Sequence, residues 1–145
     1  MDNFEIRTYR NSDEAHVINL WEKCKLVVPW NDPKKDIQRK LSERPDLFFV
    51  GLLENLLIAS CMAGFDGHRG WVYYVAVHPK HRRKGFATKL MEIAEEKLKE
   101  IGCPKIQLMV RESNLRVIEF YKKIGYKIDP LVTMGKTLID DKKFE

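Results

Sequence analysis

The stretch from Trp71 to Ile101 constrains the fold most, because it changes from an apolar run to a cationic loop and then to a long amphipathic segment. Residues 71–77 are mostly β-branched or aromatic, which predicts a strand. From Ala87 onward, apolar residues recur at helical spacing opposite a charged face. This pattern predicts a helix that ends at Gly102 and Pro104. The N-terminus of such a helix lies close to the end of the strand before it.

The loop between this strand and this helix has the composition of an anion-binding site. The first N–H groups of a helix lack intrahelical acceptors and form the positive end of its dipole. Gly85 and Ala87 carry almost no side chain, so a phosphate could approach the backbone closely. Arg82, Arg83 and Lys84 add positive charge at the same place. The loop therefore predicts a site for a phosphate-bearing ligand, and an ordinary basic helix cap is the alternative.

The composition is that of one folded domain, residues 1–145, with 44% hydrophobic and 32% charged residues. No apolar run is long enough to cross a membrane, and the start Met1-Asp2-Asn3 does not resemble a secretory signal. The three cysteines show no metal-like clustering, so we expect reduced thiols, a cytoplasmic location and no metal. The net charge of +5 could indicate a nucleic-acid partner. Because no basic surface interleaved with aromatic residues is evident, we expect neither a nucleic-acid nor a membrane partner.

The other elements follow from periodicity and from turn residues. Three further helices are expected: from Ser12 or Asp13 to about residue 25, from Asp32-Pro33 to about Arg44, and over 114–124. Six further strands are expected over 4–9, 47–53, 56–62, 105–110, 126–128 and 133–138. The fold class is thus α/β (α+β), a mixed and mostly antiparallel sheet of about seven strands flanked by about four helices.

A second motif strengthens the interpretation of the first. The spacing Arg82-x-x-Gly85-x-Ala87 is followed by Asn114 and then by Tyr121-x-x-x-Gly125-Tyr126. In order and separation, the two motifs resemble those of the GCN5-related N-acetyltransferases (GNAT), and the resemblance covers nearly the whole chain. It implies direct transfer of an acetyl group from acetyl-CoA to a primary amine of a small molecule or peptide.

The resemblance also implies a role for individual residues. The backbone of Val75 and Val77 would hold the pantetheine arm, with the Val77 N–H polarising the thioester carbonyl. Asn114 would contact the CoA arm and Tyr121 would be the general acid, although helix capping or simple packing could explain these two residues. The pyrophosphate would be bound by Arg82, Arg83, Lys84, Gly85, Phe86, Ala87 and Thr88.

The general base is not evident, because Tyr73 and Tyr74 stand where many relatives have an acidic residue. Residues 108–114 resemble a segment of ribosomal-protein N-terminal acetyltransferases, but Met109 replaces their catalytic Glu. At pH 7 a lysine amine costs about 4.6 kcal/mol to deprotonate and an α-amine about 1.4 kcal/mol. A site without a strong base therefore favours a weakly basic acceptor. The remaining candidates for the base, acting directly or through water, are Glu112, His78, Asp66 and His68.

The loops around Trp30 and Asp66 are expected to frame the acceptor. Their sequences are similar to a bacterial GNAT branch typified by YpeA, although turn formation explains their composition equally well. Two alternatives stay open, a non-catalytic acyl-CoA-binding module and a protein N-terminal acetyltransferase, and exposed sheet edges could support a homodimer. The predicted substrate contacts are Trp30, Asn31, Asp66, His68 and Arg69.

Overall fold

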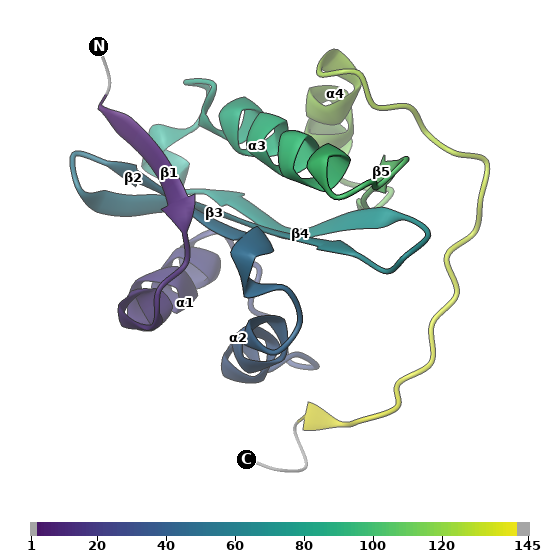
Figure 1. Cartoon of the computed structure of the whole chain (residues 1–145), viewed down its shortest axis with the longest axis horizontal. Helices are drawn as coiled ribbons and strands as arrows, with labels where there is room; N and C mark the ends of the chain where they lie inside the picture. The colour runs from purple at the N-terminus through teal and green to yellow at the C-terminus, as the bar shows by residue number, and fades with distance from the viewer. Residues whose placement is uncertain (1–2, 142–145) are drawn as a thin grey trace.

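The computed structural model describes residues 3–141, and its centre is a five-stranded sheet in the order β1-β2-β3-β4-β5 (Figure 1). Neighbouring strands are antiparallel except β4 and β5, which are parallel. The predicted mixed, mostly antiparallel sheet is therefore confirmed. Met1 and Asp2, part of the chain start that does not resemble a secretory signal, lie outside the described residues. The strands are β1 (Phe4–Thr8), β2 (Phe48–Leu53), β3 (Leu56–Phe65), β4 (Gly70–Val77) and β5 (Ile106–Gln107).

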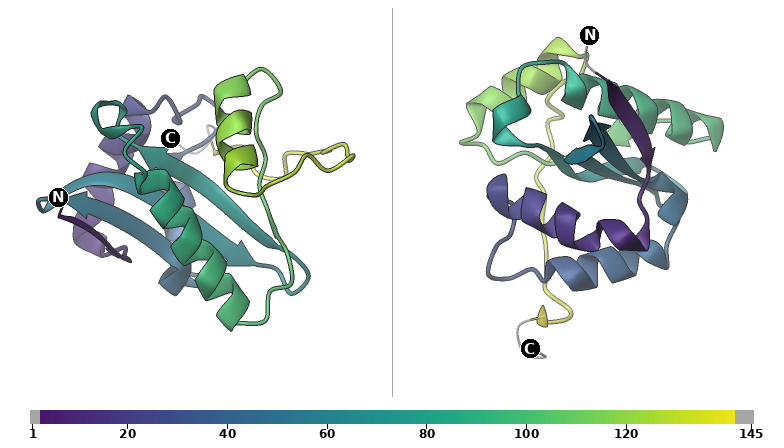
Figure 2. Two further views of the ribbon diagram at one scale, coloured as in Figure 1. Left: turned by 90° about the horizontal axis from the view of Figure 1, so that it is seen from above. Right: turned by 90° about the vertical axis from the view of Figure 1, so that its left-hand side faces the viewer.

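Four α-helices cover the two faces of the sheet, as the sequence predicts (Figures 1 and 2). α1 (Glu14–Lys23) and α2 (Pro33–Leu41) lie on one face, and α3 (Phe86–Glu100) and α4 (Leu115–Lys123) on the other. Asp32 caps α2, because its carboxylate accepts the N–H groups of Lys34 and Lys35. Within the described residues no helix is long and apolar enough to span a bilayer.

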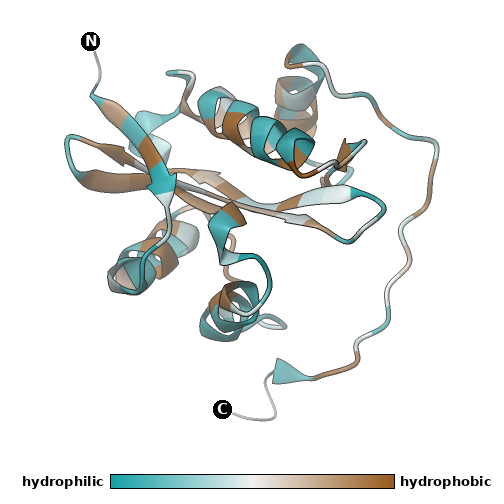
Figure 3. Cartoon of the chain, viewed as in Figure 1, coloured by the Kyte–Doolittle hydropathy of each residue, from teal (hydrophilic) through white to brown (hydrophobic). Residues whose placement is uncertain are grey.

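Each face has its own hydrophobic core. Trp21, Ile37 and Phe48 are fully buried on the α1/α2 face, and Phe86 and Leu90 on the α3/α4 face. Colouring by hydropathy shows apolar strands between helices whose outward sides are polar (Figure 3). The sheet is thus sealed on both faces, so a ligand reaches its backbone only along an edge.

Two expected strands near the C-terminus are absent, and a third is shorter than expected. Only Ile106 and Gln107 of the range 105–110 pair with a neighbour, and 126–128 and 133–138 form no strand among the described residues. Residues 127–141 instead form an extended strap that crosses to α2 (Figure 1). Its alternating residues favour extended backbone, but without an adjacent strand no ladder can form.

The strap is attached at its far end. The carboxylate of Asp141 is buried and accepts two hydrogen bonds from the Arg39 guanidinium, at 3.1 and 2.5 Å. Six apolar side chains of the strap are exposed: Ile128, Leu131, Val132, Met134, Leu138 and Ile139.

Asp13 precedes α1 but does not cap it through its side chain, which corrects the expected role of this residue. Its carboxylate is buried and accepts two hydrogen bonds from the Arg7 guanidinium, at 2.8 and 2.9 Å, and one from the Arg10 N–H. Asp13 therefore ties the start of α1 to β1.

Candidate active site

A β-bulge interrupts β4 at Tyr74. Ser60 of β3 lies opposite Ala76, whereas Met62 lies opposite Tyr73, so Cys61 alone faces two residues of β4. Tyr74 has a φ of 51°, an unusual value for a residue with a bulky side chain. Such strain persists only where the surroundings hold it in place.

Four interactions hold this bulge. The Tyr74 ring stacks on Trp21 of α1 with centroids 3.7 Å apart. Trp21 Nε1 donates to Ser60 Oγ (2.9 Å), and Ser60 Oγ donates to the Tyr74 carbonyl (2.8 Å). The Tyr74 hydroxyl donates to Asp36 Oδ2 of α2 (2.6 Å). Burial and the Asp36 carboxylate raise the pKa of Tyr74 well above its ordinary value.

The outer edge of β4 is open beyond Trp71. β5 pairs with β4 only at Gly70–Ile106 and Trp71–Gln107, so within residues 3–141 no strand covers the outer edge of the rest of β4. Val75 and Val77, the two predicted binding positions on this strand, lie in the open part. An extended ligand could add to this edge as a further strand would.

The open edge leads directly to the predicted anion site. The first intrahelical hydrogen bond of α3 runs from the Lys89 N–H to the Gly85 carbonyl (3.2 Å). The N–H groups of Phe86, Ala87 and Thr88 therefore have no acceptor in their own helix, and none is found elsewhere in the described chain. Gly85 has a φ of 83°, and a Cβ added there would meet no heavy atom within 4 Å. The backbone at this point is accessible to a phosphate.

The three predicted cations do not all point the same way. Arg82 Nε donates to the Val77 carbonyl (3.0 Å), so its side chain turns back to the end of β4 and holds the loop. Arg83 has a φ of 62°, and it is exposed, as is Lys84. Cys24 Sγ also donates to the Val77 carbonyl (3.4 Å), so this carbonyl oxygen accepts two hydrogen bonds, one from Arg82 and one from Cys24.

Tyr121 lies in the buried cluster on the α3/α4 face, together with Cys61 and Val77. It is 8% exposed, and its hydroxyl has no hydrogen-bond partner among residues 3–141. Burial, and next the nearby Cys61, raise the pKa of Tyr121, so the phenol keeps its proton at neutral pH. The hydroxyl oxygen is not among the fully enclosed polar atoms that lack a partner, so solvent or a bound ligand can reach it. Packing of the ring stays the alternative to a catalytic role.

Asn114 occupies the N-cap position of α4, but its side chain makes no capping hydrogen bond. It is exposed, and only its backbone bonds to the helix, through its carbonyl and the Ile118 N–H (3.2 Å). Capping through the side chain therefore does not account for this residue.

The structure separates the predicted acceptor residues into two groups. Trp30 and Asn31 lie in the α1–α2 loop, where the Arg111 guanidinium is 5.9 Å from the Trp30 ring centroid and Asn31 interacts with the Tyr74 hydroxyl. Through these side chains the α1–α2 loop approaches both β4 and the segment after β5. Asp66 lies in the β3–β4 turn and accepts the N–H groups of His68 and Arg69, both at 2.8 Å. That turn is at the closed end of the β4–β5 pair, away from the bulge.

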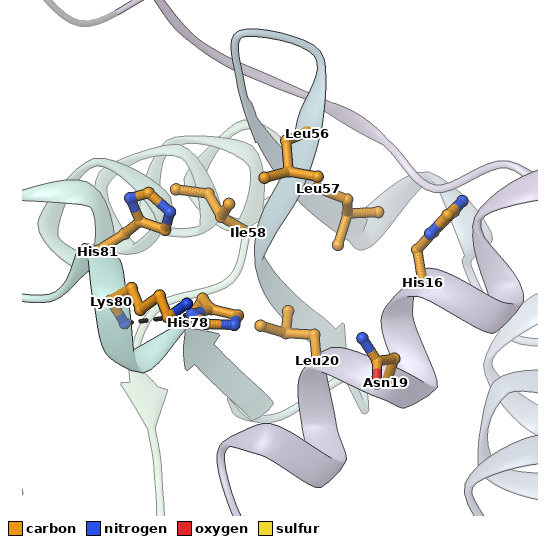
Figure 4. A pocket seen from close by; sticks show the side chains of 9 residues that line it. All are labelled: His16, Asn19, Leu20, Leu56, Leu57, Ile58, His78, Lys80 and His81. Atoms are coloured by element: carbon orange, nitrogen blue, oxygen red, sulfur yellow. Dashed lines mark hydrogen bonds between the residues drawn. The ribbon is translucent and has the colours of Figure 1, made fainter.

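His78, another of the predicted bases, lies away from both Tyr74 and Tyr121. His78 and His81 line a hollow of about 240 Å³ between α1, the β2–β3 hairpin and the turn after β4 (Figure 4). His78 Nδ1 accepts the Lys80 N–H (3.1 Å), and burial lowers the pKa of His78. Neither Tyr74 nor Tyr121 lines this hollow. Glu112 is exposed after β5.

Sequence reasoning missed Asp36, Ser60 and the role of Trp21. Asp36 looks like an ordinary charge in the first turn of α2, and Ser60 is one small residue in an apolar strand. They meet Tyr74 across 38 and 14 residues of sequence, and no local pattern reports such contacts.

A bulged strand with an open edge, a helix N-terminus at its end and a tyrosine beside it suit the binding of an extended, phosphate-bearing ligand. Residues 15–126 match the model of the acetyltransferase (GNAT) family, and the chain belongs to that family. An acetyltransferase of Pectobacterium atrosepticum is 49% identical over 140 residues, covering 97% of this chain and 99% of the relative.

Solved structures agree on the fold. A PaiA N-acetyltransferase from Thermoplasma acidophilum, in complex with coenzyme A, superimposes with a TM-score of 0.77 at 18% identity. The match covers 90% of this chain and 93% of that one. AAC(6')-Iy, in complex with a CoA bisubstrate analogue, gives a TM-score of 0.78 at 15% identity, covering 94% and 99%. The expected GNAT-like fold class is therefore confirmed, with five strands where about seven were expected.

Proposed function

We propose that this chain transfers the acetyl group of acetyl-CoA directly to a primary amine of a small molecule or peptide. The observation that carries the proposal is that the strand β4, with its open edge, runs from the cluster that contains Tyr121 and Val77 into the loop that leads to the N-terminus of α3. The coenzyme A held by the structural relative from Thermoplasma acidophilum supports the same choice of substrate.

The phosphates would bind at the free N–H groups that follow Gly85, where no side chain blocks the backbone. The pantetheine arm would lie along β4 at Val75 and Val77, with the Asn114 amide beside it. The Val77 N–H would stabilise negative charge on the thioester oxygen as the amine attacks.

In the reaction a C–N bond forms and the C–S bond breaks. The neutral amine loses one proton, and the departing thiolate gains one from the Tyr121 hydroxyl, which then regains a proton from solvent. Because burial raises the pKa of this phenol, it acts as a hydrogen-bond donor that assists rather than as a strong acid. No cysteine nucleophile is required: burial raises the pKa of Cys61 to about 12, so it stays a thiol.

Two other functions are weaker. A non-catalytic acyl-CoA-binding module would not need a hydroxyl at Tyr121, because a phenyl ring would pack equally well in the same cluster. A protein N-terminal acetyltransferase would be expected to carry an acidic residue at Met109, whose side chain is exposed. The free thiols Cys24, Cys61 and Cys103 support a reducing compartment, and we propose a cytoplasmic, single-domain enzyme.

The test is consumption of acetyl-CoA, followed as free CoA by chromatography, across small amines, amino acids and short peptides. Turnover with one acceptor class supports the enzyme and identifies its substrate chemistry. Acetyl-CoA binding without turnover for any acceptor would favour the binding module instead.

A further inference from the structure

We propose that Tyr74 and Asp36 together accept the proton that the acceptor amine loses. The inference rests on the proposed amine acetylation, and it assigns the base that is absent from the strand sequence. The phenol of β4 and the carboxylate of α2 form one unit, because the hydroxyl donates to Asp36 Oδ2 at 2.6 Å.

This pair has the right place in the fold. Tyr74 belongs to the α1/α2 face, whereas Tyr121 belongs to the α3/α4 face, and the bulged strand β4 lies between them. A thioester on the open edge would therefore have a proton donor on one side and a proton acceptor on the other. The α1–α2 loop beside Tyr74 carries Trp30 and Asn31, the two predicted acceptor contacts that the structure brings to this region.

The Tyr74 hydroxyl, ring and backbone carbonyl each have a fixed partner. The positive φ of Tyr74 is strained, yet the Trp21 ring, the Ser60 hydroxyl and Asp36 all fix it. Strain of this kind concentrates at functional sites, where it aims a side chain.

The surrounding charges suit a cationic substrate. The carboxylate of Asp32 acts on Tyr74 from the N-terminus of α2, and Asp36 shares that side of the site. The one cation that contacts Asp36 is Arg39 of the same helix, at 3.3 Å on Oδ1 within the described residues, and Arg39 is also bound by Asp141. Asp36 Oδ2 is thus left to Tyr74.

The proton step balances in two transfers. The protonated amine first passes one proton to Tyr74 Oη, which frees the nitrogen lone pair to bond to the thioester carbon. The phenol proton moves at the same time along the existing hydrogen bond to Asp36 Oδ2. Asp36 then releases the proton to solvent, and the pair returns to its starting state.

The experiment compares Tyr74→Phe and Asp36→Asn with Tyr126→Phe. Tyr126 is a matched control, because its hydroxyl also donates to a carboxylate at 2.6 Å, that of Glu95, on the other face of the sheet. Each variant is assayed for acetyl-CoA affinity by calorimetry and for kcat against pH with the best acceptor amine.

We expect Tyr74→Phe and Asp36→Asn to lower kcat at pH 7 by about 100-fold, with acetyl-CoA affinity unchanged within about twofold. Their rates should recover as the pH approaches the pKa of the amine, which then arrives neutral, while Tyr126→Phe keeps the wild-type pH profile. A purely structural pair would lower the rate equally at all pH values, and that result would overturn the proposal. Absence of turnover by the wild type would instead overturn the proposed function itself. Tyr74→Phe keeps the ring on Trp21, so it remains a test even if Asp36→Asn fails to fold.

Discussion

The rings of Tyr74 and Trp21 lie almost parallel, with an interplanar angle of 13° and centroids 3.7 Å apart. This contact joins the bulge of β4 to α1, and the Trp21 indole N–H continues the connection through Ser60. The irregular backbone at the candidate site is therefore built on the largest fully buried side chain of the core.

Replacing Ser60 with Ala should destabilise the protein by about 2–3 kcal/mol. The change leaves the indole N–H of Trp21 without its acceptor and the Tyr74 carbonyl without its donor, and unsatisfied buried groups are costly. Urea denaturation at pH 7 measures the loss. The control is Ser42→Ala, which removes only an exposed hydrogen bond to the Arg39 carbonyl and should cost less than about 0.5 kcal/mol. Equal losses in the two variants would contradict the role given to Ser60.

Replacing Gly85 with Ala should cost about 1 kcal/mol of stability, because its φ of 83° disfavours any side chain. It should also weaken acetyl-CoA binding, and Gly85→Glu should abolish it through steric block and negative charge. Gly67→Ala is a matched control, with a φ of 92° and open space around an added Cβ. It should lose similar stability but bind acetyl-CoA normally in calorimetry. Unchanged affinity in Gly85→Glu would show that the phosphates bind elsewhere.

Replacing Tyr121 with Phe should lower kcat by about 100-fold while acetyl-CoA affinity stays within about twofold of the wild type. The phenyl ring preserves packing against Phe120 and Tyr126, so stability should hardly change. Steady-state kinetics together with a binding titration separate the two effects. A variant that loses affinity but keeps kcat would assign Tyr121 to binding instead.

Asp13 should make stability depend on pH in acid. The hydrogen bond from Arg7 is the main cause that holds the pKa of Asp13 below its usual value. A lowered folded pKa stabilises the protein above the unfolded value of about 3.9 and loses this effect as the pH falls through the folded value.

Asp13→Asn should therefore be less stable than the wild type by about 2 kcal/mol at pH 7. The difference should shrink below about pH 4, as urea denaturation at several pH values would measure. Asp46→Asn is the control, because Asp46 also has a lowered pKa beside Arg44 but is exposed. A gap between wild type and Asp13→Asn that stays constant into acid would contradict this account.

Much of the fold could be predicted because its signals are local. Asp32 and Pro33 predict the start of α2, as N-cap and first helical residue. The helical spacing of apolar residues over 86–100 predicts α3, because one face of that helix is buried. The strands expected over 126–128 and 133–138 failed for a non-local reason. Their residues do favour extended backbone, but a strand needs backbone pairing, and in the described chain β5 meets this segment only through side chains, at Asp129.

In the candidate site too, features within one sequence segment could be predicted, and contacts between distant segments could not. The loop that contains Gly85 is one continuous segment, so its spacing could indicate an anion site. The pair of Tyr74 and Asp36 depends on α2 packing beneath β4, and the inward turn of Arg82 depends on the position of the Val77 carbonyl. Contacts of this kind exist only after the chain has folded.

The contact between β4 and β5 is confined to two residue pairs, both at the end next to the β3–β4 turn. Beyond these two pairs no ladder hydrogen bond joins the two strands in the described chain. Past β5 the chain contacts the α1–α2 loop through side chains instead, with the Arg111 guanidinium 5.9 Å from the Trp30 ring centroid. The edge of β4 at Val75 and Val77 is thus left without a strand partner, and substitutions of the flanking side chains can change this edge while the hydrogen-bonded framework of the sheet stays the same.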